Sequence, residues 1–206
     1  MINEKCAVIV IDFQNDYVHE NGRISKFGLG TERIRSMIPN VERLLNNVRV
    51  KNIPIIHFQM TEDPELIEKS LKDKRINAFG SPENWALAIP GTWGHELVLA
   101  PKENEPIFQK NASDVFSNNE LKKLLEEKEI KTLIIIGGYT HACVDASVRS
   151  AIKNGYDVVL VTDLVNSPDR LQELHEASLK VLTTQFAHGT TSDEIIKLID
   201  YNHFLK

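Results

Sequence analysis

Short apolar runs and amphipathic stretches alternate along this chain. Runs rich in β-branched residues predict buried strands at residues 7–11, 53–58, 106–110, 133–136 and 157–162, with a short last strand near Gly189. Between them, apolar residues recur at helical spacing over 31–51, 118–128, 144–152, 167–186 and the segment after Thr191. We therefore expect an α/β fold of three α/β/α layers around a mainly parallel, Rossmann-type central sheet.

Local signals refine the ends of these helices. Pro39 predicts a kink or restart within the first long helix. Ser167 and Pro168 are typical of an N-cap and a first helical residue. Thr191 and Glu194 have the spacing of a capping box and predict the start of the last helix.

Residues 62–101 form a long polar segment that four prolines interrupt. We expect a short helix at 66–71 and loop over the rest. Loops of this length commonly close over an active site or reach a neighbouring subunit. The aromatic side chains of Trp85 and Trp93 are available to line a substrate pocket or to pack the loop onto the domain, and the sequence leaves both roles open.

Length and composition describe an ordinary globular protein. The 206 residues carry a net charge of −5, and no repeat or linker divides them, so we expect one domain over 1–206. The absence of a broad basic cluster argues against nucleic acid as a partner. No apolar run is long enough for a membrane span or a signal peptide, which favours a cytoplasmic protein. Two cysteines make no disulfide framework, and Cys6 fits a buried strand.

Cys143 is the cysteine in a reactive setting. The apolar run 133–136 ends at Gly137 and Gly138, which permit backbone conformations closed to other residues, and a helix follows. A thiol at the start of a helix faces unpaired N–H groups and the positive end of the dipole, which favour a thiolate. Strand, glycine turn and nucleophile together resemble the elbow of serine hydrolases.

Asp12 and Lys110 each follow a predicted strand, as Cys143 does. Taken alone, an Asp in this position is a turn former and a Lys is solvated surface. In a parallel sheet, however, the carboxyl ends of all strands face one crevice, so the three side chains are expected at the same edge.

Several segments together resemble the isochorismatase-like hydrolases. GGYTHACVDAS resembles the cysteine motif of that superfamily, VIVIDFQNDY at 8–17 its first strand and Asp, and FQKNASDVF at 108–116 the segment with its Lys. GTWGHELVLAP at 91–101 and NGYDVVLVTDLV at 154–165 also match, in the order of the family. The resemblance covers nearly the whole chain.

The resemblance implies a Cys-Asp-Lys catalytic triad of Cys143, Asp12 and Lys110. It also implies an oxyanion hole formed by the N–H groups of Tyr139 and Cys143, aimed by a cis peptide between Gly138 and Tyr139. Phe13, Asn15, Trp85 and Trp93 are the expected pocket residues. Family members are usually oligomers, so we expect a homodimer or homotetramer.

Nicotinamidases of this superfamily carry an Asp-x-His metal pair at the end of the second strand, where this chain has Gln59 and Thr61. Neither is a good transition-metal ligand, so we expect no metal, and no glycine-rich loop indicates another cofactor. The expected substrate is a small amide, carbamoyl or ureido compound cleaved at a C–N bond. A vinyl-ether hydrolase of the isochorismatase type, a nicotinamidase and a non-enzymatic interaction protein remain the alternatives.

Overall fold

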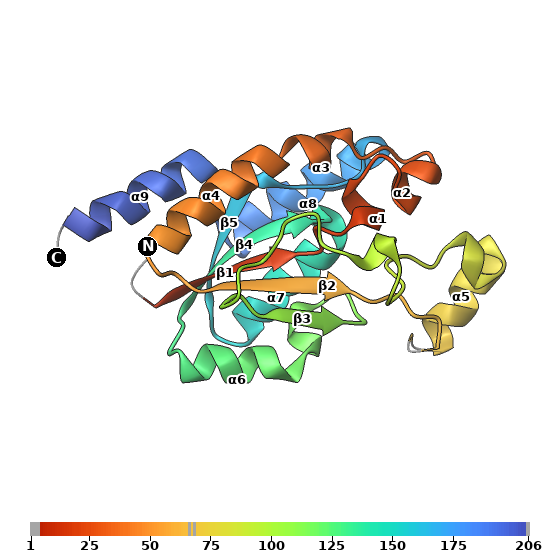
Figure 1. The fold of residues 1–206 in the computed structure, drawn as a ribbon, viewed down its shortest axis with the longest axis horizontal. Helices are drawn as coiled ribbons and strands as arrows, with labels where there is room; N and C mark the ends of the chain where they lie inside the picture. Colours follow the sequence, from red (N-terminus) through yellow and green to blue (C-terminus); the bar gives the residue numbers. More distant parts are fainter. Residues whose placement is uncertain (1–4, 66, 68, 205–206) are drawn as a thin grey trace.

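The computed structural model describes residues 5–65, 67 and 69–204. Six strands form one sheet in the order β3-β2-β1-β4-β5-β6, and every neighbouring pair is parallel (Figure 1). The strands are β1 (Cys6–Ile11), β2 (Ile55–Met60), β3 (Ile107–Lys110), β4 (Thr132–Gly138), β5 (Asp157–Asn166) and β6 (His188–Thr190). The expected parallel α/β fold is confirmed.

β1 lies at the centre of the sheet and has no exposed residue. Val8 pairs with Ile55 of β2 on one side and with Ile134 of β4 on the other. Successive side chains of a strand point to opposite faces, so a continuous apolar run supplies both layers of core at once. This is why the central strands contain hardly a polar residue.

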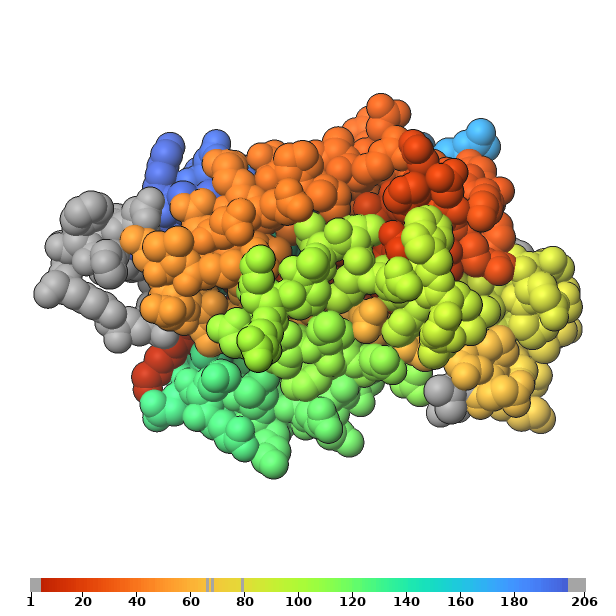
Figure 2. Space-filling view, in the orientation of Figure 1, coloured from red at the N-terminus to blue at the C-terminus, as the bar shows by residue number. Residues whose placement is uncertain are grey.

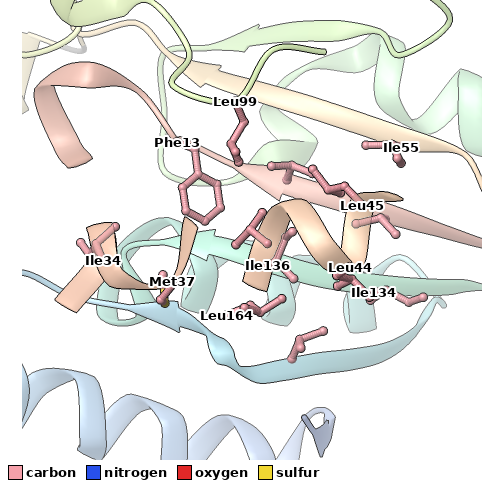
Figure 3. Packing of buried hydrophobic residues seen from close by; sticks show 14 of the residues in the cluster. Phe13, Ile34, Met37, Leu44, Leu45, Ile55, Leu99, Ile134, Ile136 and Leu164 are labelled. Atoms are coloured by element: carbon pink, nitrogen blue, oxygen red, sulfur yellow. The ribbon is translucent and has the colours of Figure 1, made fainter. Parts of the chain in front are cut away.

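Helices α3 (Glu32–Ser36), α4 (Ile38–Val50) and α9 (Ser192–Phe204) cover one face of the sheet (Figure 1). The expected break near Pro39 lies at Met37, between α3 and α4. Their buried side chains pack on Val8, Val10 and Ile136 of the sheet. Figure 3 shows part of this cluster. The contributors from this layer are Ile34, Met37, Val41, Leu44, Leu45, Val48, Ile195 and Ile199.

The opposite face is covered by α6 (Asn119–Glu127), α7 (Asp145–Lys153) and α8 (Gln172–Gln185). Leu121 and Leu125 of α6 and Val148 of α7 are fully buried against it. The capping box expected at the start of α9 is present, because Glu194 accepts from the Thr191 N–H at 2.9 Å and the Thr191 hydroxyl accepts from the Glu194 N–H at 3.3 Å.

The chain order of the strands reverses between β1 and β4, so their connections run in opposite directions from this point. Such a switch point opens a crevice at the carboxyl ends of the strands. The short helices α1 (Asn15–Val18) and α2 (Arg23–Lys26) and helix α5 (Lys69–Phe79) lie at that end, where the strand arrows of Figure 1 point. In Figure 2, the segment of about residues 85–105 crosses the surface below α4.

Three sequence-based boundaries need correction. Where a short helix was expected at 66–71, the structure has α5 from Lys69 to Phe79; residues 66 and 68 lie outside the described residues. β5 continues past 162 to Asn166, because Val165 pairs with Gly137 beyond a shift of register. Ser167 and Pro168 do not begin α8, which starts at Gln172 after a single 3₁₀ turn.

Within the described ranges, none of the helices is long and apolar enough to cross a membrane.

Candidate active site

Asp12, Lys110 and Cys143 meet at the carboxyl edge of the sheet. The Lys110 ammonium donates to Asp12 Oδ2 at 2.8 Å and to Cys143 Sγ at 3.3 Å. Asp12 and Lys110 are almost completely buried, whereas Cys143 is partly exposed. One oxygen of the carboxylate, Asp12 Oδ1, has no hydrogen-bond partner. A nucleophile, a carboxylate and a cation are thus in mutual reach.

Lys110 reaches Asp12 by crossing the intervening strand. It ends β3, whereas Asp12 follows β1, and β2 lies between them. Two strand spacings are about 9–10 Å, a gap that only a long side chain can bridge. Its ammonium passes Met60, whose sulfur it contacts at 3.4 Å. Asp12 has a backbone φ of +56°, in the left-handed region that residues other than glycine rarely adopt.

Cys143 lies in a single π-helical turn, Thr140–Val144, which leads directly into α7. The turn is closed by a hydrogen bond of 3.1 Å from the Val144 N–H to the Tyr139 carbonyl. The peptide bond between Gly138 and Tyr139 is cis. Gly137 has a φ of +137°, and a Cβ there would lie 2.2 Å from the Ile11 carbonyl oxygen, so only glycine fits this approach to β1.

Burial raises the pKa of the Cys143 thiol to about 12; Lys110 opposes this rise and the charge of Asp12 adds to it. This direction is opposite to that of the expected thiolate, because burial and a neighbouring carboxylate act against the cation and the helix dipole. Burial also raises the pKa of Asp12 despite the opposing effect of Lys110, which makes this carboxylate a stronger base than a surface Asp.

The three residues Gln14, Asn15 and Asp16 fasten the long segment 62–101 over this edge. Gln14 Nε2 donates to the Met60 and His95 carbonyls at 2.9 and 3.0 Å. Asn15 Nδ2 donates to the Trp93 carbonyl at 2.8 Å. Asp16 accepts from the N–H of residue 88 at 2.8 Å. Each amide or carboxylate satisfies backbone groups that the segment would otherwise bury unpaired.

The four expected pocket residues lie in different surroundings. Trp85 is buried and lines a cavity, with its indole N–H donating to the Gly80 carbonyl at 3.1 Å. Asn15 holds the loop, and Trp93 is 45% exposed and packs edge-on against His19. The ring of Phe13 is buried in the core cluster between the sheet and the helices, as Figure 3 shows, and its expected place in the pocket stays a prediction.

Gln59 and Thr61 both contact His95 of the long segment. Gln59 Nε2 donates to the His95 carbonyl at 2.9 Å, and the Thr61 hydroxyl is 3.2 Å from His95 Nε2. Over the part of the chain that the structure describes, no group of three or more His, Cys, Asp or Glu side chains could hold a metal ion.

Sequence reasoning missed several polar residues near the site. Glu62 is buried just after β2 and pairs with Arg75 of α5. His141 Nδ1 lies 2.7 Å from the buried Ser167 hydroxyl, and its ring stacks on Tyr139. Glu62 lies two residues beyond a buried strand. A carboxylate after a buried strand is also the feature of the sequence that made Asp12 a candidate.

Comparisons with known proteins agree with this geometry. The isochorismatase domain model matches residues 6–194. A ureidoacrylate amidohydrolase RutB from Agrobacterium fabrum is 28% identical over 180 residues, which are 81% of this chain and 79% of that protein. The crystal structure of an isochorismatase-like hydrolase from Alkaliphilus metalliredigens is 28% identical with a TM-score of 0.78, covering 94% of this chain and 98% of that one.

A third known structure has a similar fold. The crystal structure of N-carbamoylsarcosine amidase from Thermoplasma acidophilum is 21% identical with a TM-score of 0.72, covering 92% of this chain and 97% of that one. The family match spans most of the chain, so this protein belongs to the isochorismatase family and is a hydrolase of that family.

Proposed function

We propose that this protein is a cysteine-dependent amidohydrolase that cleaves a C–N bond of a small amide, carbamoyl or ureido compound without a metal. The observation that carries the proposal is the Lys110 ammonium lying 2.8 Å from Asp12 and 3.3 Å from the Cys143 sulfur. The similarity to ureidoacrylate amidohydrolases supports the choice of a C–N bond. The Gln59 and Thr61 side chains, which bond to His95, support a mechanism without a metal.

In the first half of the reaction, Asp12 takes the Cys143 proton as the sulfur attacks the substrate carbonyl carbon. The backbone N–H groups of Tyr139 and Cys143 hold the oxyanion of the tetrahedral intermediate. Asp12 then gives the proton to the leaving nitrogen, the C–N bond breaks, and a thioester remains. Lys110 stabilises the negative charge that passes between the carboxylate and the sulfur.

In the second half, Asp12 takes a proton from a water molecule that attacks the thioester. The carbon–sulfur bond breaks and the Cys143 thiol regains its proton from Asp12. The enzyme returns to its starting state. The raised pKa of Asp12 helps this carboxylate to take a proton from the thiol and, later, from water.

Ammonia release from a panel of amides, ureas and carbamoyl compounds, nicotinamide included, tests the proposal with and without a chelator. We expect chelator-insensitive release that Cys143→Ala abolishes and Cys6→Ala keeps, since Cys6 is buried in the core away from the site. Circular dichroism checks that both variants fold. Turnover that survives Cys143→Ala, nicotinamide turnover that a chelator stops, or no ammonia from any compound would contradict it. Pyruvate released from isochorismate by Cys143→Ala would favour a vinyl-ether hydrolase.

A further inference from the structure

Two hydrogen bonds between a hydroxyl and an imidazole hold the nucleophile turn, which is the π-helical turn Thr140–Val144 that carries Cys143. The Thr140 hydroxyl lies 2.8 Å from His175 Nδ1. The neighbouring residue, His141, has its Nδ1 atom 2.7 Å from the Ser167 hydroxyl. Both hydroxyls belong to fully buried residues. The mechanism proposed above gives neither imidazole a role.

The two hydrogen bonds come to the turn from different elements. His175 lies in the first turn of α8, which covers this face of the sheet. Ser167 directly follows β5, whose last residue, Asn166, pairs with Gly138 of β4. Because Gly138 lies only two residues before Thr140, the extension of β5 places Ser167 beside the start of the nucleophile turn.

The buried hydroxyls determine the state of both rings. Among the described residues, the Thr140 hydroxyl has no hydrogen-bond partner other than His175. A hydroxyl has one hydrogen to donate, and leaving that hydrogen unpaired in the interior costs free energy. The hydrogen therefore goes to Nδ1, which requires a neutral ring with its proton on Nε2. The same holds for His141, because the part of the chain that the structure describes gives the Ser167 hydroxyl no second partner.

The surroundings of the two rings favour the neutral form. Burial lowers the pKa of both His141 and His175. Around His175, the positive charge of Arg33 in α3 and the ring of His141 also lower the pKa, whereas the neighbouring Glu176 opposes them. The charges and the hydrogen bonds thus agree that both imidazoles accept and both hydroxyls donate.

The groups of the proposed reaction depend on the position of this turn. Single π-helical turns are rare and occur mostly at functional sites. Cys143 must keep its sulfur near the Lys110 ammonium, which lies 3.3 Å away. Tyr139 precedes the turn, and the ring of His141 stacks on its ring with centres 6.1 Å apart. A displacement of about 1 Å is enough to slow a reaction about a hundredfold.

We propose that His175 and His141 are positioning residues. As neutral rings they accept from the Thr140 and Ser167 hydroxyls, and they thereby hold the Cys143 sulfur and the proposed oxyanion donors in the geometry of the reaction. The inference rests on the proposed amidohydrolase function. It adds two residues that act through the nucleophile turn and do not touch the substrate.

The test compares His175→Asn with His175→Gln on the amide that the substrate panel selects. The amide of Asn lies close to the position of Nδ1 and can accept from the Thr140 hydroxyl, whereas the amide of Gln lies near the position of Nε2. We expect His175→Gln to lower kcat by about tenfold or more and to change KM by less than about threefold, because it disturbs the reacting groups and not the binding of substrate. His175→Asn restores most of kcat. Equal kcat values of the folded Asn and Gln variants overturn the inference.

Two further variants remove the hydroxyls and keep the inference testable if the His175 variants do not fold. We expect Thr140→Val and Ser167→Ala each to lower kcat by about tenfold. Thr183→Val is the matched control, because the Thr183 hydroxyl also makes a hydrogen bond of 2.8 Å, but to the Leu179 carbonyl within α8. Its kcat stays within about twofold of wild type. An unchanged kcat in folded Thr140→Val or Ser167→Ala contradicts the inference.

Alkylation of Cys143 by iodoacetamide separates this inference from the proposed chemistry, because it needs no hydrolysis. The sulfur bonds to the methylene carbon of the reagent, iodide leaves, and Asp12 takes the thiol proton as in the first step proposed above. In a Cys6→Ala background, we expect the rate to fall about fivefold or more in His175→Gln and to stay near wild type in His175→Asn.

This pattern of alkylation without ammonia release from any amide supports the inference while the amidohydrolase proposal fails. Equal alkylation rates in the three proteins overturn the inference, whether or not the wild type releases ammonia. If ammonia is released in that case, the amidohydrolase proposal still stands.

Discussion

Glu105 is the centre of a buried network that holds the start of β3. It accepts from Arg49 Nε and Nη2 at 2.6 and 2.9 Å, from the Lys102 N–H at 3.0 Å, and lies 3.1 Å from His57 Nε2. The next residue, Pro106, accepts from the His57 N–H at 2.9 Å. Because β3 carries Lys110 at its other end, this network indirectly positions the candidate site.

The network makes a definite contribution to stability. Burial raises the pKa of the Glu105 carboxyl, but the hydrogen bonds from Arg49, Lys102 and His57 outweigh it and lower the value from 4.5 to about 2. Each pH unit of that difference corresponds to about 1.4 kcal/mol, so ionised Glu105 stabilises the fold by about 3 kcal/mol. A lowered carboxyl pKa stabilises above the unfolded-state value, and the contribution is lost as the pH falls from about 5 toward 2.

We predict that Glu105→Gln lowers the free energy of unfolding by about 3 kcal/mol near neutral pH. Urea unfolding of the two proteins, repeated at decreasing pH, measures the difference. It shrinks to about 1.4 kcal/mol near pH 3, because the Glu105 carboxyl is then largely protonated in the unfolded state and must lose that proton on folding. Glu103→Gln is the control, since Glu103 is exposed two residues earlier. A difference below about 0.5 kcal/mol near neutral pH, or one that does not change with pH, would refute the reasoning.

Three further predictions follow from the site and its supports. Lys110→Met removes the cation that lowers the pKa of Asp12, so the acid limb of the kcat/KM profile moves to higher pH; a profile that keeps its position would show that Asp12 is not the base. Gly137→Ala destabilises by about 2–4 kcal/mol in thermal unfolding, whereas Gly138→Ala, whose Cβ would meet nothing within 4 Å, costs less; equal costs would contradict the packing argument. Light scattering is expected to show a dimer or tetramer, and a mass near 23.4 kDa would exclude both.

The meeting of Asp12, Lys110 and Cys143 could be predicted from the sequence because it needs only topology. Each residue follows an apolar run, and parallel strands bring the ends of such runs to one edge. The catalytic roles of the three residues came from the family resemblance, since an Asp or a Lys at the end of a strand is by itself a turn former or solvated surface. The cavity that Trp85 lines could not be predicted in this way, since its walls come from segments that no regular pattern joins.

Helix α5 shows why the loop region was not foreseen. Its sequence, KSLKDKRINAF, has no apolar stripe, so hydrophobic periodicity does not indicate a helix. Tertiary contacts hold it instead, through Arg75 to Glu62 and Lys72 to Glu65. The raised pKa of Cys143 was not foreseen for a similar reason: burial and neighbouring charges decide a pKa, and neither is visible along the chain.

The pairing of β1 with β4 has a consequence for how activity arises during folding. Cys6 aligns with Thr132, so the centre of the sheet joins segments from opposite halves of the chain. Such contacts lose the entropy of closing a large loop before they stabilise the fold, which makes this topology slow to form. Asp12 and Cys143 come together only when that pairing is complete. The recovery of hydrolysis after dilution from denaturant therefore reports the formation of the whole sheet, and helical signals are expected to return before it.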